Sequence, residues 1–380
     1  MKIAVNTRFL IKDKLEGIGI YTQEIFKRVA ALLPQHDFYF LFDRSPSDEF
    51  IFSDNIHPVV VSPQARHPFL WYWWFEYSVP KALSAIDADV FISTDGYASL
   101  KTEVPQIITI HDLGFEHYPA HTPFLVRNYY RHFTPKFCLK AEKIIAVSAF
   151  TKMDIIQHYK IDGDKIDVVY NGVENIRVSG TPQEIKRIRS HFNIKDTPYF
   201  IFIGAVHPRK NVLQLLKAFE RLKSDLLINH QLIIVGRNAW MNLEVENYMQ
   251  QMAGKQDVVW IEQIERNQLM SLLKDALALV FPSLFEGFGI PIIEAMQLGV
   301  PVITSNTASM PEVAGDAAIT VNPKSTEEIG RAMQLIISDT SLRESLIEKG
   351  IKRAKLFNWD ISAQKMAEVI TEVLEKSKRK

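Results

Sequence analysis

The sequence contains very little cysteine, no excess of either charge and no long apolar run. Cys138 is its single cysteine, so an internal disulfide framework is excluded and a reducing compartment is expected. Forty-four basic residues balance forty-four acidic residues, which argues against a nucleic-acid partner. No stretch approaches the roughly 20 apolar residues of a membrane-spanning helix. We therefore expect a cytoplasmic globular protein.

Short apolar runs alternate with segments of helical periodicity along the whole chain. The first residues, MKIAVNTRFL, are interrupted by polar side chains and predict a buried strand, not a signal peptide. Similar runs are DVFIS at 89–93, QIITIH at 106–111, YFIFIG at 199–204 and ALVFPS at 278–283. Continuous apolar runs are typical of parallel strands buried on both faces. The alternation predicts an α/β chain in which a doubly wound, Rossmann-like sheet occurs twice.

The length of the chain also favours two domains. A chain of 380 residues is too long for one ordinary core and suits two domains of roughly 200 residues each. We expect the break in the polar segment from Glu174 to about Asp196. Ligands of open α/β sheets bind at the carboxyl ends of the strands. The candidate functional residues are therefore those that directly follow strands.

The most informative segment is residues 282–302, PSLFEGFGIPIIEAMQLGVPV. It follows a strand, and a turn with Gly287 and Gly289 leads into a helix. Such a turn offers backbone N–H groups to an anion. Glu286 and Glu294 flank the turn, and their carboxylates can accept hydrogen bonds from sugar or ribose hydroxyls. The alternative is that Glu294 only decorates a helix and that the glycines form an ordinary turn.

Three further segments follow strands or begin helices. In GAVHPRKN, 204–211, Arg209 and Lys210 precede a helix. Cations at the start of a helix interact unfavourably with its dipole, and a bound anion such as a diphosphate would offset this cost. The alternative is a solvated pair of cations. The segment Gly17-Ile18-Gly19 precedes the first amphipathic helix and lacks the third glycine of a dinucleotide fingerprint. His111 ends a strand, and its role is either structural or functional.

Taken in order, these segments resemble the GT-B glycosyltransferases of the retaining family 4. The two glutamates of EGFGIPIIEA (286–295) together with PRKN (208–211) are the specific part of the resemblance. The other matching pieces are GIGIY (17–21), HDL (111–113), VSAFT (147–151), NGV (171–173), VGR (235–237), SNTASMPEVAGDAA (305–318) and FNWDISAQ (357–364).

The resemblance implies a GT-B fold, with two Rossmann-like domains facing across a cleft. Residues 1–173 would form the acceptor-side domain and residues 174–358 the domain that binds the nucleotide-sugar donor. The C-terminal helix, 359–380, would cross back onto the N-terminal domain. The reaction implied is transfer of a sugar from a nucleotide diphosphate with retention of configuration.

The resemblance also implies residue roles. Arg209 and Lys210 would neutralise the donor diphosphate in place of a metal ion. Glu294 would bind the ribose, Glu286 the transferred sugar, and His111 would lie beside the anomeric carbon. The catalytic residues would be His111, Arg209, Lys210 and Glu286. The donor site would comprise Gly17, Gly19, Gly204, Arg209, Lys210, Arg237, Gln263, Ile264, Glu286, Gly287, Phe288, Gly289, Ile290 and Glu294, with no metal and no cofactor.

The donor and the acceptor are less closely specified. GDP-mannose is the first choice of donor, and UDP-linked glucose or N-acetylglucosamine is the alternative. The acceptor would be a glycan or glycolipid, and peripheral contact with the inner face of a membrane is left open. Rival functions are a nucleotide-sugar epimerase, a nucleotide-dependent oxidoreductase, which the absent third glycine disfavours, and a non-catalytic sugar-binding protein.

A metal-dependent transferase is a further rival, because D-x-D occurs at 87–89 and 162–164. Both copies precede strands, whereas a metal-binding pair should follow one, so we predict turn residues. His117 and His121 have i, i+4 spacing, but Pro119 between them argues against a metal-binding helix.

An aromatic segment, residues 67–80, remains to be placed. Leu70, Trp74 and Tyr77 fall on one face at helical spacing, which favours packing in the core. The alternative is an aromatic surface that binds an acceptor sugar or a bilayer headgroup layer.

Overall fold

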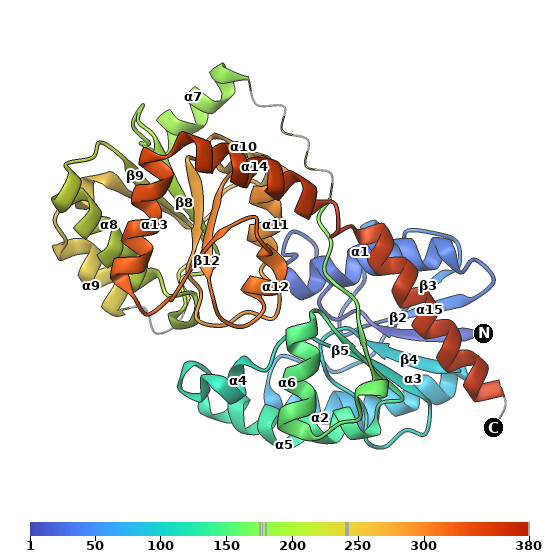
Figure 1. The fold of residues 1–380 in the computed structure, drawn as a ribbon. Coiled ribbons are helices and arrows are strands. Elements are labelled where there is room, and N and C mark those ends of the chain that lie inside the picture. The colour runs from blue at the N-terminus through green and yellow to red at the C-terminus, as the bar shows by residue number, and fades with distance from the viewer. Residues whose placement is uncertain (175, 177, 179–180, 240–242, 379–380) are drawn as a thin grey trace. The chain divides into compact units, whose positions relative to one another are not determined.

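The computed structural model describes residues 1–174, 176, 178, 181–239 and 243–378. The chain divides into two compact units, of which the first is Met1–Gly172 with Trp359–Lys380 and the second is Val173–Asn358. Each unit contains one parallel sheet covered by helices (Figure 1). Within the described residues, no helix is long and apolar enough to cross a membrane.

The first unit contains a 7-stranded parallel sheet in the order β3-β2-β1-β4-β5-β6-β7. From β1 the chain winds outward to β3 and then resumes at β4 on the other side, so the winding reverses between β1 and β4. Every strand except β7 and the exposed edge strand β3 is almost wholly buried, as its apolar run predicts. The strands are β1 (Lys2–Asn6), β2 (Asp37–Phe42), β3 (Ile56–Val60), β4 (Val90–Ser93), β5 (Gln106–Ile110), β6 (Lys143–Ala146) and β7 (Ile166–Val168).

The helices of the first unit come from both ends of the chain. The C-terminal helix α15 packs on α1 and buries Met366, Ile370 and Val373, as the resemblance implies. Residues 379–380 of the predicted helix lie outside the described part. The helices are α1 (Gly17–Leu32), η1 (Asp48–Phe50), α2 (Pro68–Trp73), η2 (Trp74–Ser78), α3 (Val79–Ile86), α4 (Gly114–His117), η3 (Pro119–His121), α5 (Phe124–Lys140), α6 (Ala149–Tyr159), η4 (Gly163–Lys165) and α15 (Trp359–Lys378).

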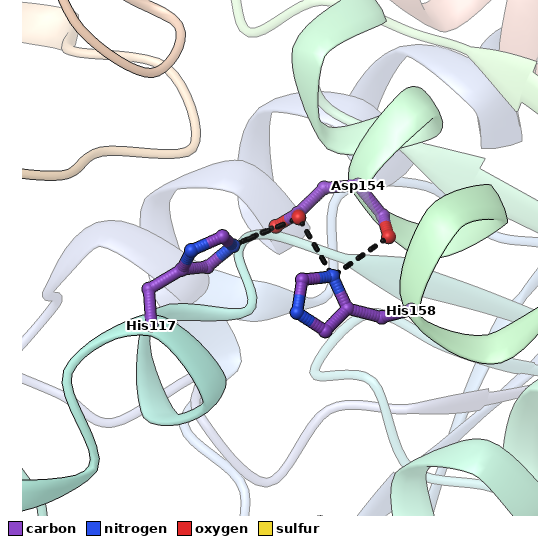
Figure 2. A group of neighbouring side chains, drawn as sticks. All are labelled: His117, Asp154 and His158. Carbon is purple, nitrogen blue, oxygen red and sulfur yellow. Dashed lines mark hydrogen bonds and ion pairs between the residues drawn. The ribbon is translucent and has the colours of Figure 1, made fainter.

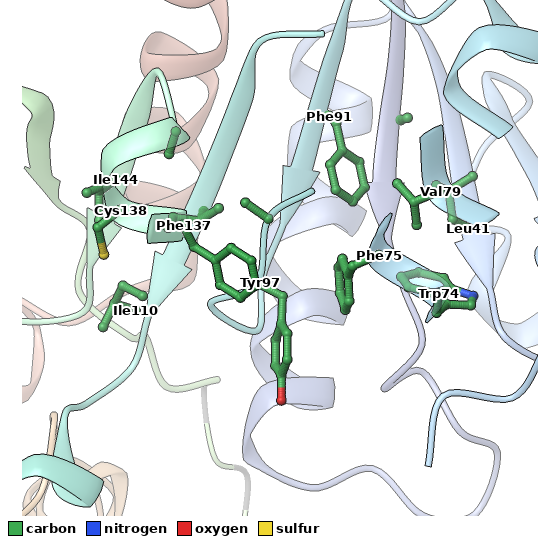
Figure 3. Packing of buried hydrophobic residues seen from close by; sticks show 14 of the residues in the cluster. Leu41, Trp74, Phe75, Val79, Phe91, Tyr97, Ile110, Phe137, Cys138 and Ile144 are labelled. Carbon is green, nitrogen blue, oxygen red and sulfur yellow. The ribbon is translucent and has the colours of Figure 1, made fainter. Parts of the chain in front are cut away.

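One core cluster of the first unit lies between the sheet and the helices α2, α3 and α5 (Figure 3). Phe75 stacks on Tyr97 with 4.9 Å between the ring centroids. Cys138 is fully buried here, and its burial raises the pKa of the thiol to about 12. A thiol with such a high pKa is a packing group and a poor nucleophile.

Residues 67–80 differ from the predicted α-helical face. Helix α2 passes into a π-helical turn, η2 (Trp74–Ser78), before α3 begins. A π-helical turn contains more residues than an α-helical turn, so side chains after it leave the face of those before it. Trp74 is fully buried, whereas Tyr77 is 45% exposed. The prediction of one core face for Leu70, Trp74 and Tyr77 is therefore wrong at Tyr77.

The second unit contains a 6-stranded parallel sheet in the order β10-β9-β8-β11-β12-β13. Its winding reverses between β8 and β11, so the predicted repeated doubly wound fold is confirmed. The strands are β8 (Tyr199–Ile203), β9 (Gln231–Val235), β10 (Val258–Ile261), β11 (Ala278–Phe281), β12 (Val302–Ser305) and β13 (Ile319–Val321). The helices are α7 (Pro182–His191), η5 (Pro208–Lys210), α8 (Val212–Leu226), α9 (Leu243–Gln251), η6 (Lys255–Asp257), α10 (Arg266–Asp275), α11 (Ile290–Gln297), α12 (Met310–Ala314), α13 (Thr326–Ser338) and α14 (Thr340–Ala354).

Candidate functional site

The predicted donor residues of the second unit follow four neighbouring strands. Gly204 follows β8, Arg237 lies just beyond β9, residues 263–264 lie beyond β10, and residues 286–290 lie beyond β11. Because β10, β9, β8 and β11 stand side by side and are parallel, these loops share one edge of the sheet. The loops after β8 and β11 flank the point where the winding reverses, which is the usual ligand position in such sheets.

Two hydrogen bonds join the loop after β8 to the loop after β11. Arg209 and Lys210 lie in the short helix η5, and Asn211 then begins α8 in a left-handed conformation, with φ of 64°. The side-chain nitrogen of Asn211 donates to the carbonyl of Pro282 at 2.9 Å. The backbone N–H of Leu284 donates to the carbonyl of Arg209 at 2.8 Å. The two cations are therefore held against the β11 loop.

Glu286 is a buried carboxylate that faces both cations. Nζ of Lys210 lies 2.6 Å from its Oε1, and Nη1 of Arg209 lies 4.0 Å from its Oε2. Lys210 also lies over the ring of Phe281, with Nζ 5.1 Å from the centroid. Two cations against one carboxylate leave a surplus of one positive charge at this place. The cluster is therefore suited to an anionic ligand.

Hydroxyl groups of residues in and after β12 also fix the β11 loop, by hydrogen bonds to its backbone carbonyls. Ser309 Oγ donates to the carbonyl of Glu286 at 2.8 Å and approaches that of Phe288 at 3.1 Å. Gly289 then caps α11 with φ of +102°, a conformation that favours glycine. Sequence reasoning did not assign this hydroxyl series. Further bonds of this type run from Thr304 to Phe281, from Ser305 to Ser283 and from Thr307 to Leu284.

Glu294 is buried on α11 and forms an ion pair with Nη2 of Arg266, the first residue of α10. Sequence reasoning missed Arg266. The available signal was its position two residues after Ile264, which was assigned to the donor site together with Gln263. The structure thus brings the β10 loop and α11 together through one ion pair.

Gly236 is a second residue that sequence reasoning did not assign. Its φ is +152°, and a Cβ atom there would lie 2.0 Å from the carbonyl oxygen of Gly204. The carbonyl of Arg237 accepts a hydrogen bond from Val206 N–H at 3.0 Å. The loops after β8 and β9 therefore run in close backbone contact, which only glycine permits at position 236.

The first unit contains a pocket of about 170 Å³ at the carboxyl ends of β4 and β5. Asp95 and Tyr97 follow β4, whereas His111 and Asp112 follow β5. The lining therefore combines carboxylates with aromatic rings. The lining residues are Ile18, Asp95, Gly96, Tyr97, Ile110, His111, Asp112, Phe115, Tyr130, Thr134 and Phe137.

His111 points one ring nitrogen into the protein. Its Nε2 lies 2.7 Å from the carbonyl oxygen of Thr94, so Nε2 carries the proton and donates. The ring also meets Tyr21 edge to face at 5.1 Å. Burial lowers the pKa of His111, so the imidazole is neutral at neutral pH. The structure therefore places the predicted histidine in the wall of the pocket, as a neutral group.

A buried ion pair lies behind the same pocket. Nε of Arg8 donates to Oδ2 of Asp95 at 2.6 Å, and both side chains are almost fully buried. The guanidinium also lies over the rings of Tyr97 and Phe75, at 4.5 and 5.3 Å. Burial opposes the charged form, but Asp95 raises the pKa of Arg8 above its ordinary value. Sequence reasoning treated Arg8 only as an interruption of an apolar run.

Gly17 and Gly19 lie within α1 and not in a loop before it, because α1 begins at Gly17. A Cβ atom at position 19 would lie 2.5 Å from the carbonyl oxygen of Phe9, whereas position 17 has open space. Gly19 therefore permits a close backbone approach within the first unit. The expected loop before the first helix is instead the first turn of that helix.

The aspartates of the two D-x-D copies are turn and cap residues, as predicted. Asp87 ends α3 with φ of 58°, and the side chain of Asp162 caps η4 by accepting from Asp164 N–H at 3.0 Å. His117 and His121 lie in separate short helices, α4 and η3, so they do not share a helix face. The argument against a metal-binding helix at this spacing is confirmed.

Comparison with known families covers almost the whole chain. Residues 15–177 match the family described as Glycosyltransferase Family 4, and residues 184–353 match the family described as Glycosyl transferases group 1. The chain belongs to glycosyltransferase family 4. This family-4 glycosyltransferase is 26% identical to the O-antigen chain mannosyltransferase B of Escherichia coli, over 92% of its own length and 94% of that protein. It is 32% identical to the O-antigen chain mannosyltransferase RfbU of Salmonella typhimurium, over 57% of each chain.

Solved structures share the fold of the family-4 glycosyltransferase. Sucrose-phosphate synthase from Thermosynechococcus elongatus superposes with a TM-score of 0.78 at 17% identity, over 99% of each chain. WaaG, a glycosyltransferase involved in lipopolysaccharide biosynthesis, superposes with a TM-score of 0.75 at 18% identity, over 97% of this chain and 99% of that one. The predicted GT-B class is confirmed.

Proposed function

We propose that this glycosyltransferase transfers mannose from GDP-mannose to a polysaccharide or glycolipid acceptor, with retention of configuration. The observation that carries the proposal is the pair Arg209 and Lys210 beside Glu286, at the point where the second sheet reverses its winding. The choice of mannose is supported by the O-antigen mannosyltransferases among the relatives. A UDP-linked glucose or N-acetylglucosamine is the alternative donor.

The second unit would bind the donor without a metal ion. When the bond between the anomeric carbon and the phosphate oxygen breaks, negative charge grows on the diphosphate. The side chains of Arg209 and Lys210 and the backbone N–H groups at the start of α11 would stabilise that charge. Glu294 would accept hydrogen bonds from the ribose, and Glu286 with residues 287–290 would hold the sugar.

The transfer itself would proceed on one face of the sugar. The acceptor oxygen bonds to the anomeric carbon on the face from which the diphosphate departs, and its proton passes to the departing phosphate oxygen. His111, neutral and fixed by Thr94, would contact the transferred sugar without exchanging a proton. This arrangement accounts for retention without a carboxylate nucleophile.

The first unit would bind the acceptor in its pocket. Asp112 supplies a carboxylate for sugar hydroxyls, and Tyr97, Phe115 and Tyr130 supply apolar surface for the ring faces. Pockets that combine apolar walls with a few polar groups are typical of specific small-ligand sites. A glycan end is therefore the ligand that we propose for this pocket.

Calorimetric titration of GDP, UDP and ADP into the purified protein in EDTA tests the donor assignment. We expect GDP to bind and the binding to be lost in Glu294→Ala. Glu344→Ala is the matched control, since Glu344 is an exposed carboxylate on α14. Binding of UDP alone would replace the mannosyl proposal by its UDP-sugar alternative. Failure of all three nucleotides to bind, or binding that requires Mg²⁺ or Mn²⁺, would refute the metal-free donor site.

A further inference from the structure

Three side chains of the first unit converge outside the pocket (Figure 2). His117 ends α4, whereas Asp154 and His158 lie on α6. Nε2 of His117 lies 2.8 Å from Oδ1 and 3.0 Å from Oδ2 of Asp154. Nδ1 of His158 lies 3.0 Å from the same Oδ1. One nitrogen of each imidazole is thus directed at a single carboxylate.

The cluster combines a buried centre with an accessible rim. The side chain of Asp154 is 5% exposed, whereas those of His117 and His158 are 32% and 36% exposed. An ion could therefore reach the carboxylate from solvent while remaining shielded on its inner side. The burial of Asp154 also means that the carboxylate needs partners, which the two imidazoles supply.

We propose that His117, Asp154 and His158 bind one zinc ion, with water completing the coordination. Two ligands at i, i+4 share one face of α6, and the third comes from a separate element, which is a recurring way of building zinc sites. The three ligand atoms all lie within 4.8 Å of one another. Two imidazoles and one carboxylate suit Zn²⁺, whereas Mg²⁺ and Ca²⁺ prefer oxygen ligands.

The distances from the two histidines to Asp154 require only a small adjustment around the ion. Ligand atoms of a tetrahedral zinc site lie about 3.3 Å apart, given bonds of about 2.0 Å. The histidine-to-aspartate distances here are 2.8 to 3.0 Å, so the side chains would separate by a few tenths of an ångström. Rotation of the two partly exposed imidazoles can provide this movement.

The ion would act on structure and not on the transfer reaction. Helix α4 also contains Phe115, which lines the pocket of the first unit. Joining His117 to α6 through a metal ion would fix the segment that carries Phe115. Arg209, Lys210 and Glu294 belong to the second unit, so nucleotide binding in EDTA is compatible with this proposal.

Zinc titration of the full chain tests the proposal. The protein is purified without a histidine tag, treated with EDTA, freed of the chelator and titrated with ZnCl₂ in a calorimeter. We expect one ion per chain, with affinity at least about tenfold lower in His117→Gln, His158→Gln and Asp154→Asn. His132→Gln is the matched control, because His132 is exposed on α5 and contacts Lys136 instead of the cluster. Its zinc affinity should equal that of the unsubstituted chain.

Thermal unfolding of each variant in EDTA separates loss of the site from loss of the fold. The two histidines are partly exposed, so their variants should unfold near the midpoint of the unsubstituted chain. Zinc should raise that midpoint in the unsubstituted chain and in His132→Gln only, because an ion that binds the folded state stabilises it. No saturable zinc binding, or an unchanged zinc affinity in either histidine variant, would overturn the proposal and leave only hydrogen bonds to Asp154.

Discussion

Nζ of Lys210 lies 2.6 Å from Oε1 of Glu286, and the two residues follow the two strands between which the second sheet reverses its winding. The ion pair gives the ammonium a fixed position before a diphosphate arrives. It also neutralises a carboxylate whose residue is only 7% exposed. One contact thus stabilises the loop and also positions the ammonium that we propose neutralises the donor diphosphate.

Lys210→Ala should lower the rate of transfer more than tenfold, which corresponds to about 1.4 kcal/mol of transition-state stabilisation. The reason is that the ammonium facing the departing diphosphate is removed. Initial rates with saturating donor measure the effect. Lys274→Ala, at an exposed cation on α10, should leave the rate unchanged. A rate near that of the unsubstituted enzyme in Lys210→Ala would contradict the diphosphate role.

Asp95→Asn should destabilise the first unit by about 3–5 kcal/mol, because the buried guanidinium of Arg8 loses its counter-ion. Urea unfolding followed by tryptophan fluorescence measures the loss. The double variant Arg8→Met with Asp95→Asn removes both charges and should recover part of the stability. Equal stability of Asp95→Asn and the unsubstituted chain would mean that the pair is not buried as described.

Stability should fall as the pH drops below about 6.5, the ordinary pKa of histidine. Burial lowers the pKa of His111 in the folded state, while Asp112 and Asp95 partly oppose this shift. In that pH range the unfolded chain binds a proton at this residue before the folded chain does, which favours unfolding. The free energy of unfolding at pH 7 and pH 5 should therefore differ less in His111→Asn. An identical difference in both proteins would argue against a buried neutral imidazole.

Gly236→Ala should destabilise the second unit by at least about 1–3 kcal/mol. The added Cβ would lie 2.0 Å from the carbonyl oxygen of Gly204, in a backbone conformation that disfavours alanine. Gly17→Ala is the control, since its Cβ would meet no atom within 4 Å. Chemical denaturation compares the two. A Gly236→Ala protein as stable as the control would show that the two loops separate easily.

The sequence predicts the strands and the edge that carries the donor residues, because buried parallel strands leave continuous apolar runs. It does not predict the face of Tyr77. The π-helical turn that rotates this residue outward is defined by its backbone hydrogen bonds. The spacing of apolar residues does not indicate such a turn. The order of residues along the chain thus identifies elements better than it identifies their faces.

The pairs that join distant elements also escape sequence reasoning. Arg8 and Asp95 follow neighbouring strands, but nothing in either segment indicates that they pair. Asp154 and His158 are recognisable as i, i+4 neighbours, whereas His117 joins them only through the packing of α4 against α6. Arg266 begins α10 directly after the loop that was assigned to the donor site, so its ion pair with Glu294 is the easiest of these contacts to predict.

Helix α15 covers α1 although the entire second unit separates them along the chain. On the ribosome, the first unit therefore remains incomplete until residues 359–378 have been synthesised. The second unit is contiguous and can finish folding before then. A nascent chain that ends at residue 358 is expected to expose to chaperones the side of α1 that packs on α15, including Tyr21, whose ring contacts Trp359. Folding of the first unit is therefore completed only after α15 has been synthesised.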